Sequence, residues 1–141
     1  MKISVIGSGS WGTALAMLLV ENGHDVTLWS YLEDQARQLQ ESRVNPLLPG
    51  VTLPDGLTVT SDLTCARGCG VVVLATPSFA VRETARKLAP ILDEGAVLVS
   101  VSKGIEKDTS FTMTQIIQQE VGDAHPVVAL SGPSHAEEVS R

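Results

Sequence analysis

Short apolar runs alternate with longer segments of helical periodicity along the whole chain, and this alternation limits the folds open to it. The runs predict strands at 2–6, 25–29, 58–60, 71–75, 97–101 and 127–130. The other segments predict helices at 10–22, 33–42, 79–89 and 111–121, and a proline- and glycine-rich loop at 45–57. Because the strands are almost entirely apolar, helices must cover both faces of the sheet. The sequence therefore predicts an α/β fold, a doubly wound parallel sheet in a single domain with strand order 3-2-1-4-5-6.

The bulk composition narrows the class of protein. A length of 141 residues fits one domain. The formal net charge of −6 argues against a general nucleic-acid surface. No apolar stretch reaches the roughly 18 residues of a membrane span, and the start of the chain lacks the features of a secretion signal. We therefore expect a cytoplasmic protein whose partners include neither nucleic acid nor a membrane.

The cysteines and histidines do not form a pattern that predicts a metal site. Cys65 and Cys69 are the only cysteines, and their spacing predicts one face of a helix. No histidine or further cysteine stands near enough to complete a zinc site, so we interpret them as reduced structural thiols. His24, in a helix–strand turn, and His125, before a proline, are predicted to be surface residues.

The pattern G-x-G-x-x-G is matched by Gly7-Ser8-Gly9-Ser10-Trp11-Gly12. It stands where its mechanism requires, between the first predicted strand and the first predicted helix. Gly7 permits a tight turn, Gly9 lets the backbone approach a pyrophosphate, and Gly12 lets the helix pack against the strand. Because free N–H groups at a helix start attract anions, the motif predicts a dinucleotide-binding site.

The residues after the second strand bear on the choice of cofactor. In many dinucleotide-binding domains an acidic residue at that position binds the ribose hydroxyls of NAD. Here Ser30 and Tyr31 occupy the position, and Glu33 falls in the next predicted helix. No carboxylate repels a 2′-phosphate there, and the nearest arginines are Arg37 and Arg43. The sequence leaves NAD and NADP both open.

Three further segments follow the carboxyl ends of predicted strands, at the edge where open α/β sheets bind ligands. They are Ala-Thr-Pro-Ser at 75–78, Ser-Val-Ser-Lys-Gly-Ile-Glu at 100–106 and Ser-Gly-Pro-Ser-His-Ala-Glu-Glu-Val at 131–139. With Gly-Ser-Trp-Gly-Thr-Ala-Leu-Ala at 9–16 and Leu-Pro-Gly-Val-Thr-Leu-Pro at 48–54, they make the whole chain resemble NAD(P)-dependent glycerol-3-phosphate dehydrogenases.

This resemblance implies a Rossmann fold and an oxidoreductase that interconverts sn-glycerol 3-phosphate and dihydroxyacetone phosphate by hydride transfer with NAD or NADP, a step that feeds glycerophospholipid synthesis. The residues implied at the cofactor are Gly7, Gly9, Ser10, Trp11, Gly12, Tyr31, Lys103 and Ala136. Those implied at the substrate, a small phosphate ester, are Lys103, Gly132 and Ser134. An ammonium group such as that of Lys103 can stabilise charge on the carbonyl oxygen during hydride transfer.

The same resemblance sets the expected domain organisation. Residues 1–141 correspond to the NAD(P)-binding domain, and the family's helical substrate domain is expected outside this chain. That domain carries the lysine that acts as general acid and base, so we expect no catalytic residue within the chain and no activity from the chain alone. Apolar surface around 127–141 then favours self-association, and a homo-oligomer is an expected state.

Some residues depart from the family pattern or have a simpler interpretation. Some relatives carry an arginine near 30–31, where this chain has Ser30 and Tyr31, and many carry an aromatic residue where this chain has Leu47. Core packing is an alternative role for Trp11, and a helix cap is one for Ser78. His135 occupies the variable position of its segment, so we do not expect it to be catalytic.

Two other functions stay open from the sequence. One is a stand-alone dinucleotide-binding or sensing module that catalyses no reaction, and an open reading frame beyond Arg141 would argue against it. The other is a related reductase that acts on a different small acid or keto compound. The segment Lys103-Gly104-Ile105-Glu106 argues against that reductase.

Overall fold

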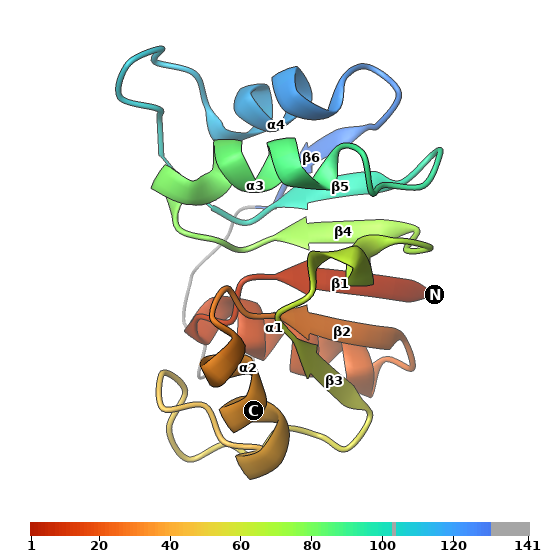
Figure 1. Ribbon diagram of the computed structural model, residues 1–141, viewed down its shortest axis with the longest axis vertical. Coiled ribbons are helices and arrows are strands. Elements are labelled where there is room, and N and C mark those ends of the chain that lie inside the picture. The colour runs from red at the N-terminus through yellow and green to blue at the C-terminus, as the bar shows by residue number, and fades with distance from the viewer. Residues whose placement is uncertain (103, 131–141) are drawn as a thin grey trace.

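The computed structural model describes residues 1–102 and 104–130, which form a six-stranded sheet with helices on both faces (Figure 1). The strands are β1 Lys2–Ile6, β2 Asp25–Trp29, β3 Leu57–Thr60, β4 Val71–Leu74, β5 Val97–Ser100 and β6 Val127–Ala129. The α-helices are α1 Ser10–Glu21, α2 Glu33–Ser42, α3 Val81–Leu88 and α4 Met113–Val121, and the 3-10 helices are η1 Leu63–Ala66 and η2 Ser78–Ala80. All neighbouring strands are parallel, in the order β3-β2-β1-β4-β5-β6, which confirms the predicted sheet and its strand order.

Alternating strand residues divide the apolar core between the two faces of the sheet. In β4, Val73 packs in one half of the core while Val72 and Leu74 pack in the other. Helices α1 and α2 cover the first half, and α3 and α4 cover the second. The central strands β1 and β4 are buried on both faces, which explains their mostly apolar sequences, whereas Thr58 in β3 is exposed. In the described part of the chain, no helix is both long enough and apolar enough to cross a membrane.

Local signals explain where several helices begin and end. Helix α1 ends at Glu21, one residue before the predicted end, with Asn22 as its C-cap and Gly23 following with a φ of 86°. Helix α4 begins two residues later than predicted, at a capping box in which Thr112 and Gln115 satisfy each other's backbone N–H groups. The predicted helix 79–89 is divided into η2 and α3. The cap role of Ser78 was wrong, because Pro77 occupies the N-cap position of η2.

The predicted loop at 45–57 is confirmed as far as Gly56, and β3 begins one residue earlier than expected. The two ends of this loop are tied together, because the guanidinium of Arg43 donates a hydrogen bond of 2.7 Å to the Leu57 carbonyl. Its middle is anchored by Leu48, which is only 1% exposed. The loop is therefore a packed part of the fold despite its lack of regular structure.

Two expectations about single side chains were wrong. Cys65 and Cys69 do not share a helix face, because η1 ends before Gly68, which turns the chain with a φ of 80°. Both thiols are free, and burial raises the pKa of Cys65 to about 11, as expected of an unreactive thiol. His125 is not a surface residue: it is 8% exposed, and its Nδ1 lies 3.0 Å from the Ala96 carbonyl oxygen.

Candidate functional site

A cleft with a volume of about 540 Å³ opens at the carboxyl edge of the sheet, where the segments after β1 and β4 diverge. β1 and β4 are neighbours at the point where the strand order reverses, which is where open α/β sheets bind ligands. The cleft brings together the predicted cofactor contacts Gly7, Gly9, Ser10, Trp11, Gly12 and Tyr31. It also contains Leu47 from the loop before β3 and Ser102 from the loop after β5.

The glycine loop forms the floor of this cleft. Gly7 follows β1 with a φ of 129°, and its N–H donates to the Trp29 carbonyl at 3.0 Å. Helix α1 then begins at Ser10 with Gly9 as its N-cap, and no side chain caps this end. The first N–H groups of a helix have no partner within the helix itself. An anionic ligand in the cleft can satisfy them, and the helix dipole favours it.

The three glycines of the motif are needed for different reasons. A Cβ on Gly7 would lie 2.5 Å from the Ala75 carbonyl oxygen, and a Cβ on Gly12 would lie 2.2 Å from the Gly7 carbonyl oxygen. A Cβ on Gly9 would meet no protein atom within 4 Å. The fold itself therefore requires Gly7 and Gly12. It does not require Gly9, whose small size leaves open space in front of the helix start.

Gly12→Ala is expected to destabilise the protein by about 1–3 kcal/mol, the usual cost of forcing an extra carbon into a packed site. The clash is with the backbone of Gly7, which cannot move without disturbing the turn after β1. Gly9→Ala is the matched control and is expected to cost less than about 1 kcal/mol, because only a favourable N-cap residue is lost. Urea unfolding measures both variants. Equal losses at the two positions would contradict this division of roles.

The side chains after β2 bond to one another and bring no charge to the cleft. Ser8 Oγ donates to Ser30 Oγ at 3.0 Å, and Ser30 donates to Gln35 Oε1 at 2.9 Å. Ser30 is fully buried, whereas Tyr31 is 74% exposed and packs edge-on against Trp29, with ring centroids 6.1 Å apart. None of the described residues that line the cleft is acidic. Sequence reasoning missed Gln35, whose place in the first turn of the helix after β2 was the available signal.

Thr76, two residues after the end of β4, was also not singled out as a binding residue by itself. It is 6% exposed, and its hydroxyl has no hydrogen-bond partner among the described residues. Its carbonyl accepts a hydrogen bond from Ser102, which brings the start of the loop after β5 to the same wall of the cleft. A buried hydroxyl without a partner costs free energy. A polar ligand group that reaches Thr76 would remove that cost.

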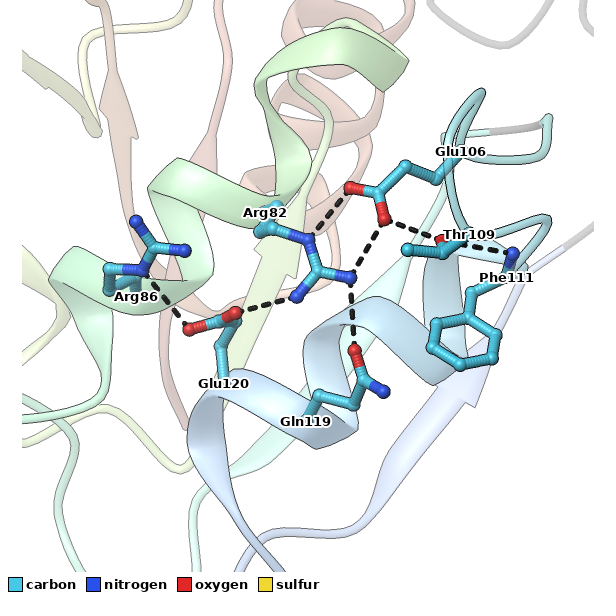
Figure 2. Close-up of polar contacts among 7 residues, drawn as sticks. All are labelled: Arg82, Arg86, Glu106, Thr109, Phe111, Gln119 and Glu120. Carbon is cyan, nitrogen blue, oxygen red and sulfur yellow. Dashed lines mark hydrogen bonds and ion pairs between the residues drawn. The ribbon is translucent and has the colours of Figure 1, made fainter.

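A cluster of charged side chains surrounds Glu106, which lies in the loop between β5 and α4 (Figure 2). Arg82, in α3, donates two hydrogen bonds to the carboxylate of Glu106, at 2.7 and 2.8 Å, and one to Glu120, in α4, at 2.7 Å. Hydrogen bonds from Arg82 and from Thr109 lower the pKa of Glu106 to about 2. Glu106 ends the segment Lys-Gly-Ile-Glu. The cluster therefore ties Glu106 to α3 and α4, which cover one face of the sheet.

Glu106→Gln is expected to lower stability at neutral pH. The pKa of Glu106 is lower in the folded protein than its ordinary value of 4.5, so its carboxylate stabilises the fold above about pH 4.5. That contribution is lost as the pH falls from 4.5 toward 2. The urea midpoint of the variant should lie below that of the wild type at pH 7 and approach it near pH 2. Exposed Glu41→Gln is the control, and an equal difference at both pH values would contradict the ion pair.

Four predicted site residues lie outside the described part of the chain: Lys103, Gly132, Ser134 and Ala136. His135 lies outside it as well. Their roles at the cofactor and substrate stay predictions. The described neighbour Ser102 lines the cleft.

Comparison with known proteins gives one consistent family. The model of the NAD-dependent glycerol-3-phosphate dehydrogenase N-terminus matches residues 2–141. A glycerol-3-phosphate dehydrogenase (NAD(P)+) of Fusobacterium nucleatum is 47% identical over 144 residues, which cover 100% of this chain and 43% of that protein. A protein of the same name from Pelotomaculum thermopropionicum is 48% identical, with 99% of this chain and 41% of that protein covered. The chain thus spans about two fifths of the length of these curated relatives.

Solved structures agree in fold. The crystal structure of glycerol-3-phosphate dehydrogenase from Coxiella burnetii is similar with a TM-score of 0.92 and 34% identity, over 99% of this chain and 43% of that one. A ketopantoate reductase from Ralstonia eutropha is similar with a TM-score of 0.75 but is 19% identical, over 92% of this chain and 40% of that one. The second likeness concerns the fold alone.

Proposed function

The chain belongs to the NAD-dependent glycerol-3-phosphate dehydrogenase family, and from this premise we propose that it is the cofactor-binding part of an enzyme that interconverts sn-glycerol 3-phosphate and dihydroxyacetone phosphate. A nicotinamide dinucleotide in the cleft, NAD or NADP, would supply or accept the hydride. Residues 1–141 form the NAD(P)-binding domain in this proposal, and a helical substrate domain completes the active site.

One observation carries the proposal: the glycine loop leaves an uncapped helix start beside open space. Gly9 has room for a side chain that the protein itself does not exclude, and the amide groups that follow it have no cap. A pyrophosphate fits this arrangement, because it needs close backbone approach and several N–H donors. Trp11 and Tyr31 then provide aromatic surface in the same cleft for the rest of the dinucleotide.

The roles at the substrate rest on the family resemblance. Lys103 would reach both cofactor and substrate, where its ammonium group stabilises charge on the C2 oxygen. Gly132 and Ser134 would contact the phosphate ester, and Ala136 the cofactor. The cytoplasmic location and the homo-oligomeric state expected from the sequence also stay predictions.

Discrimination between NADH and NADPH is expected to be less than about tenfold, or 1.4 kcal/mol. No acidic residue of the described part lines the cleft to repel a 2′-phosphate, and Ser30 is already bonded to Ser8 and Gln35. Ser30→Asp should shift the preference toward NADH through charge repulsion. The ratio of the two dissociation constants in each protein measures this. A hundredfold preference in the natural protein would show that residues other than Ser30 and those that line the cleft discriminate between NADH and NADPH.

Calorimetric titration of the chain with NADH and with NADPH tests the proposed function. Saturable binding of one molecule per chain is expected for both cofactors. An absence of binding to either at millimolar concentration would contradict a cofactor-binding role.

A further inference from the structure

We propose that Asn45 is a positioning residue for the phosphate-binding backbone, and that it acts through the carbonyl group of Ser8. Asn45 belongs to the irregular loop between α2 and β3 and stands 37 positions from Ser8 in the sequence. The proposal rests on the proposed function, because it concerns how the cleft presents its donors to a dinucleotide.

The Ser8 carbonyl is held from the interior by two side chains. Asn45 is 1% exposed, and its Nδ2 donates to the Ser8 carbonyl at 2.9 Å and to Thr13 Oγ1 at 2.8 Å. Thr13 is fully buried in α1, and its hydroxyl donates to the same carbonyl at 3.2 Å. The carbonyl, Asn45 and Thr13 therefore form a closed triangle of hydrogen bonds beneath the glycine loop.

This triangle sets the direction of the next amide group. The carbonyl of Ser8 and the N–H of Gly9 belong to one planar trans peptide, so they point in opposite directions. Because the carbonyl faces Asn45 in the interior, the Gly9 N–H faces away from the interior, on the side where Gly9 lines the cleft. A pyrophosphate oxygen in the cleft needs a backbone donor of this kind, which lies at a helix start and points toward the ligand.

Asn45 is itself immobilised by the loop that carries it. Its Oδ1 accepts a hydrogen bond from the Leu47 N–H at 3.0 Å, and its carbonyl accepts one from the Leu48 N–H at 2.9 Å. Leu48 is buried in the core, while Leu47 lines the same cleft as the glycine loop. Asn45 therefore connects the glycine loop to the loop that carries Leu47, and both the oxygen and the nitrogen of its amide group are hydrogen-bonded.

Calorimetric titration with NADH tests the proposal on two independent sets of variants. Asn45→Leu removes the main donor to the Ser8 carbonyl and should weaken binding about tenfold or more. Thr13→Val removes the second donor and should weaken binding severalfold, whereas Thr13→Ser keeps the hydroxyl and should bind like the wild type. Asn22→Leu, at the exposed far end of α1, is the matched control and should leave the affinity unchanged.

The Gly9 amide resonance in a ¹⁵N–¹H correlation spectrum separates positioning from general stability. In the wild type it should move strongly when NADH is added, and in Asn45→Leu it should already be displaced without ligand while distant resonances stay in place.

Unchanged NADH affinity in folded Asn45→Leu, or equal affinity of Thr13→Val and Thr13→Ser, would overturn the proposal. If Asn45→Leu does not fold, the two Thr13 variants decide. A wild-type chain that binds neither NADH nor NADPH would instead overturn the proposed function.

Discussion

Gly9→Val is expected to weaken dinucleotide binding by about a hundredfold or more while the protein stays folded. The φ of Gly9 is −66°, which any residue adopts, and a Cβ there meets no protein atom within 4 Å. The protein can therefore accept the valine. Its methyl groups, however, fill the space through which phosphate oxygens would approach the helix start. The binding loss follows from exclusion of the ligand, not from damage to the fold.

Calorimetry and thermal melting measure these two effects separately. Valine is a poor N-cap residue, so a cost of about 1 kcal/mol and a fall in melting temperature of about 5 °C or less are expected. Gly70→Val is a suitable control, because Gly70 lies at the opposite edge of the sheet, where its N–H bonds to the Lys2 carbonyl. Equal affinity of the wild type and Gly9→Val for NADH would contradict a role of the glycine loop in dinucleotide binding.

The 141-residue chain by itself is expected to reduce dihydroxyacetone phosphate with NADH at no measurable rate. Hydride transfer to the C2 carbon requires a proton at the C2 oxygen. Among the described residues, no acidic, basic or histidine side chain lines the cleft. A positioned acid or base contributes about 10²–10⁴-fold in rate, and correct placement of the substrate contributes several kcal/mol more. The family resemblance assigns both to a helical domain.

The assay follows the loss of NADH absorbance with the purified chain and dihydroxyacetone phosphate. A complete glycerol-3-phosphate dehydrogenase, assayed in parallel, controls for substrate and cofactor quality. Turnover near an ordinary enzyme rate of about 10 s⁻¹ would contradict the expectation. It would mean that the chain carries its own acid–base group, and His135 would be the first residue to replace.

The sheet could be predicted from sequence because its central strands, β1 and β4, are buried on both faces and therefore appear as mostly apolar runs. The details that were wrong depend on contacts between distant residues or on exact backbone turns. His125 was expected at the surface because it precedes a proline, but its ring bonds to the Ala96 carbonyl, 29 positions away. Cys65 and Cys69 have helical spacing, but the 3-10 helix ends at Ala66, and Gly68, with a positive φ, then turns the chain before Cys69.

The geometry of the glycine loop could be predicted because it depends on residues that are consecutive in the chain. Asn45 and Gln35 could not, because each acquires its role through a partner from another element. Asn45 stands in a segment rich in proline and glycine, where an asparagine is ordinarily interpreted as an exposed turn residue. Its burial and its bond to Ser8 appear only when the loop is folded against α1.

Tryptophan fluorescence during titration with NADH tests the central claim most directly, because it reports where the cofactor binds. The chain has two tryptophans, Trp11 and Trp29, and both line the cleft. NADH absorbs where tryptophan emits, so a bound molecule should quench the emission in a saturable manner, and NAD should compete with it. Gly9→Val should show only the small linear decrease that free tryptophan shows under the same conditions. The same linear decrease in the wild type would contradict the assignment of this cleft as the dinucleotide site.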